Sequence, residues 1–156
     1  MAVRTLLKQL IHLSVVVLIV AFTSVNSSAN VGINTQQAHE VIRSQHHHLL
    51  GDGKDLVSLY YFGAQQIEDS ATTVIGLERV GNDYLPVRWL LIFENDDLLG
   101  WYHPVAEFPM SFKNGTIKFP KGLTDGPVSL TPAPPASLSL QGIDVQFHKP
   151  ASPANH

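Results

Sequence analysis

Four histidines between residues 39 and 48 are the side chains best suited to bind a metal ion. His46, His47 and His48 are consecutive, and His39 precedes them by seven positions. Imidazole is a good ligand for zinc, copper and nickel. Consecutive helical residues point about 100° apart, so three adjacent histidines cannot all face one ion without unwinding the helix. Two interpretations stand: a histidine-cluster metal site, or a solvated helix end whose protonated histidines favour the negative pole of the helix dipole.

Other histidines and carboxylates could serve a small periplasmic hydrolase. His103, His148, Glu94 and Glu107 are the candidates for acid–base work, but their positions in the sequence do not say whether they meet in space. The chain has neither the Gly-x-Ser-x-Gly motif of a nucleophile elbow nor a glycine pattern that cradles phosphate. We therefore expect no cofactor, and the hydrolase stays an alternative.

The aromatic segment at residues 101–103 is the feature most typical of recognition. Trp101, Tyr102 and His103 are consecutive, and Pro104 then ends regular strand pairing. Aromatic residues combine large contact area with polar groups and are enriched at interface hot spots. Strand neighbours point to opposite faces, so at most one of Trp101 and Tyr102 should be buried against a helix, unless the sheet is covered on both sides. We predict a binding surface here; the alternative is that these side chains are core.

A single helix is predicted between Asn34 and Gly51. Asn34 is a suitable N-cap, with Gln37 placed to complete a capping box and Gly51 to stop the helix. One narrow apolar stripe runs along it, which indicates packing against a sheet. The stripe consists of Ala38, Val41, Ile42 and Leu49.

From residue 55 onward the apolar period changes to two, and turn residues recur about every ten residues. Asn114-Gly115 predicts a two-residue type I′ hairpin, and residues 94–97 predict a second hairpin. The strand before residue 94 is apolar on both faces and should be central. A change of parity at 141–142 predicts a β-bulge within the last strand. We predict strands at about 55–62, 72–80, 86–94, 98–103, 108–113, 116–119 and 137–147.

These elements predict an α+β fold. One N-terminal helix packs on a mostly antiparallel sheet, a meander that could close toward a sandwich or barrel. The predicted boundaries are a signal peptide at 1–29, one domain at 30–148 and a disordered tail at 149–156.

The first 29 residues have the order of a secretory leader. Arg4 and Lys8 precede an apolar run, and Ser27-Ser28-Ala29 is the best small-residue cleavage site, with Val25-Asn26-Ser27 as a competing one. An uncleaved membrane anchor is the alternative, but a spanning helix needs about 20 apolar residues, and His12 interrupts this run. The leader predicts a periplasmic or secreted protein that does not insert in the membrane after cleavage.

Charge and cysteine content exclude several classes of function. Without the leader the chain keeps eight basic residues against 13 acidic ones, a formal charge near −5 that gives no footprint for nucleic acid. The chain has no cysteine, which excludes disulfide scaffolds and thiol enzymes. We predict a small non-catalytic binding or accessory protein of the bacterial cell envelope, whose partner is another envelope or secreted protein. The sequence does not determine its oligomeric state.

Cleavage after Ala29 is directly measurable. The protein recovered from an envelope fraction should begin at Asn30, because the small-residue site follows the apolar run. Intact-mass spectrometry reads the N-terminus, and a species that retains residues 1–29 would contradict cleavage.

Overall fold

The computed structural model describes residues 31–151 of the chain. These residues form one compact unit. The predicted leader and residues 152–156 of the predicted tail lie outside the described residues.

Helix α2 (Thr35–Gln45) begins as the sequence predicts. The Asn34 side chain accepts a hydrogen bond from the Gln37 N–H, and the Gln37 side chain accepts one from the Asn34 N–H, both at 3.0 Å. This reciprocal pair satisfies two N–H groups that a helix start otherwise leaves free. The α-helix ends earlier than predicted, and a 3-10 turn, η1 (His47–Leu50), continues the chain to Gly51.

Nine strands follow within residues 31–151. In the order β1-β2-β3-β4-β9-β8, six of them form one sheet, and β5-β6-β7 form a second sheet. All neighbouring strands are antiparallel, which confirms the α+β fold, and neither sheet closes into a barrel among the described residues. The strands are β1 (Leu56–Ile67), β2 (Ser70–Val80), β3 (Pro86–Glu94), β4 (Asp97–Tyr102), β5 (Ser111–Lys113), β6 (Thr116–Lys118), β7 (Val128–Ser129), β8 (Ser137–Leu140) and β9 (Ile143–His148).

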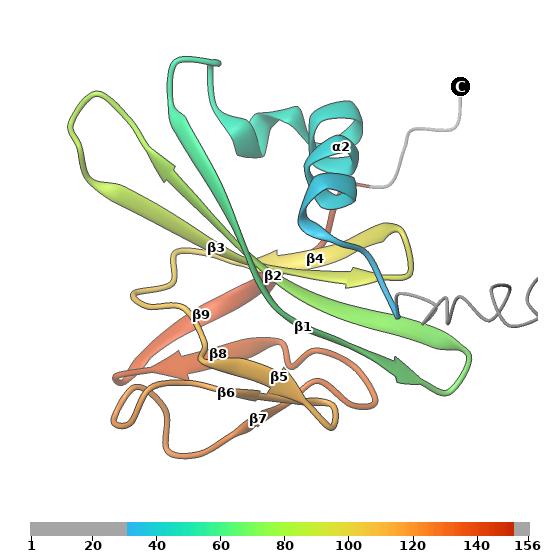
Figure 1. Cartoon of the computed structure of the whole chain (residues 1–156). Helices are drawn as coiled ribbons and strands as arrows, with labels where there is room; N and C mark the ends of the chain where they lie inside the picture. Colours follow the sequence, from blue (N-terminus) through green and yellow to red (C-terminus); the bar gives the residue numbers. More distant parts are fainter. Residues whose placement is uncertain (1–30, 152–156) are drawn as a thin grey trace, which may run out of the picture. The chain divides into compact units, whose positions relative to one another are not determined.

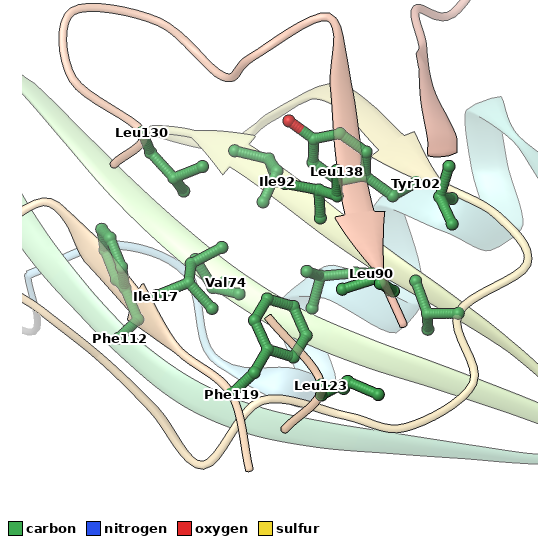
Figure 2. Close-up of a cluster of buried hydrophobic side chains, with 13 residues drawn as sticks. Val74, Leu90, Ile92, Tyr102, Phe112, Ile117, Phe119, Leu123, Leu130 and Leu138 are labelled. Carbon is green, nitrogen blue, oxygen red and sulfur yellow. The ribbon is translucent and has the colours of Figure 1, made fainter. Parts of the chain in front are cut away.

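The six-stranded sheet is covered on both faces. Helix α2 lies on one side, and the three-stranded sheet packs on the other (Figure 1). Figure 2 shows the core between the two sheets, where Val74 of the large sheet lies beside Phe112 and Ile117 of the small one. Ile92 and Leu138 belong to the same core. Strand β3 is central as predicted, since residues 89–93 are all buried.

Both predicted hairpins are present. Asn114 (φ 51°) and Gly115 (φ 67°) form the turn between β5 and β6. Strand β3 ends at Glu94 and β4 begins at Asp97, so the second hairpin also lies where the sequence places it.

The predicted single strand at 137–147 is wrong. The segment forms two strands, β8 and β9, joined by a tight turn at Gln141 (φ 52°) and Gly142 (φ 77°). The change of apolar parity at this point reflects a chain reversal rather than a bulge. Strand β9 then pairs with β4 instead of continuing a meander.

Replacing Gly115 by valine should destabilise the domain by about 1–3 kcal/mol, because a β-branched residue resists positive φ. A Cβ atom there would also lie 2.4 Å from the Thr131 Oγ1. Gly126→Val is the matched control, since no atom lies within 4 Å of the Cβ position at Gly126. Urea denaturation compares the two, and equal midpoints would contradict the turn's role.

Candidate functional site

Strand β4 places Trp101 and Tyr102 on opposite faces of the large sheet. Trp101 is half-buried beside the core under α2, whereas Tyr102 is fully buried between the sheets. The Tyr102 hydroxyl donates a 2.7 Å hydrogen bond to the Pro135 carbonyl oxygen, and burial raises its pKa above the ordinary value. Of this pair, only Trp101 is therefore open to a partner.

His103 follows β4 and stacks on a neighbouring indole. The rings of His103 and Trp89 have centroids 4.3 Å apart and planes 8° apart. The guanidinium carbon of Arg79 lies 4.9 Å from the centre of the same Trp89 ring, and an ion pair of 3.2 Å joins Arg79 to Asp55. This contact network holds the half-buried His103 ring in a fixed orientation.

Trp101 lies between two histidines from distant parts of the sequence. His48 comes from η1, and its ring centroid is 6.0 Å from that of Trp101. His148 ends β9, where the antiparallel register sets it opposite Trp101, with ring centroids 6.3 Å apart. His46 and His47 each approach His48 edge-on at 6.4 Å. We refer to these rings together as the imidazole–indole face: His46, His47, His48, Trp89, Trp101, His103 and His148.

Two histidines of this face have lowered pKa values. Burial is the main cause of the lowered pKa of His103; a hydrogen bond to a backbone carbonyl opposes it, and the charges of His148 and Arg79 reinforce it. Burial also lowers the pKa of His46, with the charge of His48 adding to the effect. Both rings are therefore neutral near pH 7 and offer one donor and one acceptor nitrogen each.

The four histidines considered for metal binding do not gather at one place. His46, His47 and His48 belong to the imidazole–indole face, while His39 lines a groove between α2 and β1. Among residues 31–151 no group of three or more His, Asp or Glu side chains is arranged to hold a metal ion. The four therefore do not form a joint ligand set in the described part of the chain.

The candidate hydrolase residues do not form an acid–base group either. Glu94 and Glu107 are exposed, and His103 contacts a backbone carbonyl rather than a carboxylate. The ion pairs found within residues 31–151 join arginines to carboxylates and involve no histidine. In a catalytic triad the histidine pairs with a carboxylate and a nucleophile, whereas the His103 ring is paired with the Arg88 carbonyl oxygen.

Sequence reasoning did not place His148 and Arg79 at the recognition surface. Both reach it through strand pairing: β9 sets His148 beside Trp101, and β2 sets Arg79 beside Trp89. No local pattern around His148 indicates this, because the β4–β9 pairing joins segments more than 40 residues apart. Arg79 and Trp89 lie on consecutive strands, so their contact is a local one.

Comparison of the chain with family models, with curated proteins and with solved structures finds no match. Across residues 31–151, none of the helices is long and apolar enough to cross a membrane. The geometry of the imidazole–indole face is therefore the basis on which a function is proposed.

The lowered pKa of His103 predicts that stability falls with acidity. The folded-state pKa of His103 lies below its unfolded value of about 6.5, so acid protonates the unfolded state first and the free energy of unfolding decreases as pH drops below about 7. His103→Gln should flatten this decrease between about pH 7 and pH 5. Urea denaturation at several pH values in that range measures the free energy of unfolding of both proteins.

His39→Gln is the control, because it removes an exposed histidine outside the face. It should keep the wild-type dependence on pH. If His103→Gln also kept the full decrease, titration of His103 would not be its source.

Proposed function

We propose that the protein is an exported, non-catalytic binding protein of the cell envelope that contacts another envelope or secreted protein through the imidazole–indole face. The observation that carries this proposal is the position of Trp101, half-buried between the rings of His48 and His148. Export rests on the leader-like order of residues 1–29.

The environment of Trp101 suits a protein partner. Its indole is held by the core under α2 on one side and by two imidazoles beside it. A rigid aromatic side chain loses little conformational entropy on binding, which is why tryptophan is enriched among interface hot spots. The partner that fits presents an apolar or aromatic anchor against Trp101.

The surrounding imidazoles add directional contacts to this apolar one. Neutral His46 and His103 can each donate and accept a hydrogen bond. The partner's polar rim can therefore pair with ring nitrogens around the anchor. This combination of an apolar centre with a hydrogen-bonding rim is the general anatomy of protein–protein interfaces.

The face offers little long-range electrostatic attraction. Arg79, the arginine that lies against it, is already paired with Asp55. The exported chain is acidic overall, so strong attraction to phosphate or anionic lipid is not expected. Short-range contact should determine affinity, and the binding should depend only weakly on salt.

Neither alternative function gains a specific observation. The hydrolase lacks an oriented histidine–carboxylate pair, and the histidine-cluster metal protein lacks a converged ligand set, within residues 31–151. Both stay predictions from the sequence alone.

Alanine substitution separates recognition from folding. Trp101→Ala should weaken the partner complex by about 2 kcal/mol or more if Trp101 is a hot spot, and leave the domain folded. Tyr102→Ala should instead cost about 3–5 kcal/mol of stability, because it empties a buried site. The measurements are a pull-down of the exported domain from envelope extract, titration of the partner recovered, and urea denaturation.

Tyr84→Ala is the matched control for the binding assay. Tyr84 is 85% exposed, lies in the turn between β2 and β3, and is not one of the rings of the face. The Tyr84→Ala variant should bind the partner as tightly as the wild type does. Equal loss of partner from the Tyr84 and Trp101 variants, or none from either, would place the recognition surface elsewhere.

A further inference from the structure

Strand β1 is an edge of the large sheet with two different halves (Figure 1). Beyond a bulge that follows Tyr61, β5 lies against it: a Cβ atom at Gly63 would come 2.5 Å from the Phe112 carbonyl oxygen, and Gln65 accepts a 2.6 Å hydrogen bond from the Gly115 N–H. Before the bulge, residues 56–61 pair with β2 and with no other strand of residues 31–151. We call residues 56–61 the open edge.

The open edge lacks the features that keep natural edge strands from pairing. Its sequence contains no charged residue and no proline, and it is apolar on both faces. Leu56, Tyr60 and Tyr61 are 74%, 41% and 51% exposed. By contrast β8, at the other edge of the sheet, is only four residues long. The open edge therefore has both free backbone groups and apolar side chains to offer a further strand.

A groove flanks the open edge on the α2 side. It has a volume of about 490 Å³, with Val57 and Leu59 of β1 on one side and exposed residues of α2, including Glu40 and Arg43, on the other. Neither Glu40 nor Arg43 forms an ion pair with another residue of the described chain. The groove thus carries one acid and one base at neighbouring positions of one helix surface.

We propose that two copies of this chain pair through their open edges, antiparallel and around a two-fold axis, so that the large sheet continues from one copy into the other. In an antiparallel pair, residues directly opposite each other point to the same face of the sheet. Because side chains alternate along a strand, the two-fold axis must then pass beside a residue and not between two residues. A register centred on Ser58 sets Leu56 opposite Tyr60 of the second copy and ends before the bulge. It covers two of the three exposed apolar side chains, Leu56 and Tyr60, with each other.

The charges of the groove favour a second copy over an unrelated extended peptide. A two-fold axis through Ser58 puts both α2 helices on the same side of the continuous sheet, with their groove sides facing each other. In the proposed dimer Glu40 of one copy faces Arg43 of the other, and the same pair recurs on the far side of the axis. A surface that carries one carboxylate and one guanidinium is complementary to its own copy turned around, so no partner of a different charge pattern is required.

A single cysteine tests the register, because the natural chain has none. Opposed residues of an antiparallel pair have Cα atoms about 4.5–5.5 Å apart, within disulfide range. Ser58→Cys should therefore form a disulfide-linked dimer under mild oxidation. Ser139→Cys, also exposed but on β8 at the other edge, is the matched control and should stay monomeric.

Charge reversal tests the contact between Glu40 of one copy and Arg43 of the other. Glu40→Lys and Arg43→Glu should each weaken self-association by about tenfold or more, measured by sedimentation equilibrium of the exported domain. Mixing the two variants should restore association, because the lysine introduced in one copy would then face the glutamate introduced in the other. The double variant should associate as the wild type does.

Three outcomes would overturn the pairing. The wild-type domain could remain monomeric at all concentrations while folded, or Ser58→Cys could cross-link no faster than Ser139→Cys. In the third outcome the domain stays monomeric, but its Ser58→Cys variant cross-links to an extended peptide that contains a cysteine. The open edge would then pair with a peptide and not with a second copy. Loss of binding by Trp101→Ala has no bearing on these results, so the proposed function and this interface can fail separately.

Discussion

The structure depends on the burial of strand β3 on both of its faces. Residues 89–93 are five consecutive buried positions, and an antiparallel strand of this kind requires a cover on each side of the sheet. Leu91 and Phe93 pack under α2, and Leu90 and Ile92 pack against the small sheet. Each buried aliphatic side chain contributes about 1.5–3 kcal/mol. This one segment therefore requires both covering layers, helix α2 on one face and the small sheet on the other.

The candidate site lies where one of those covers ends. Helix α2 and η1 cover the sheet face to which Trp89 and Trp101 belong, but they leave Trp101 partly exposed. The two indoles are bordered by imidazoles, namely His48, His103 and His148. A histidine can pack its ring against an indole and still hydrogen-bond water, which makes it suitable for the margin of a core.

Local signals were sufficient for much of the fold. The capping box at Asn34, the Asn114-Gly115 turn and the doubly apolar β3 each depend on residues close in sequence. The β8–β9 turn was missed because Gln141 occupies a positive φ that its residue type seldom adopts. The site was predicted only in part: Trp101 and His103 are neighbours in sequence, but His48 and His148 join them through packing and strand pairing that no local pattern encodes.

Helix α2 connects the two proposed surfaces. One of its sides faces β1 across the groove that holds Glu40 and Arg43, and η1 at its end carries His48 to Trp101. Because a two-fold axis perpendicular to the sheet keeps equivalent faces on the same side, a dimer through β1 would present both imidazole–indole faces in one direction. Two such faces on one rigid sheet would bind a partner with repeated or paired sites far more tightly than either alone, since the second contact becomes intramolecular. A modest single face, with one partly exposed indole and a few neutral imidazoles, would then be enough for firm attachment to such a partner.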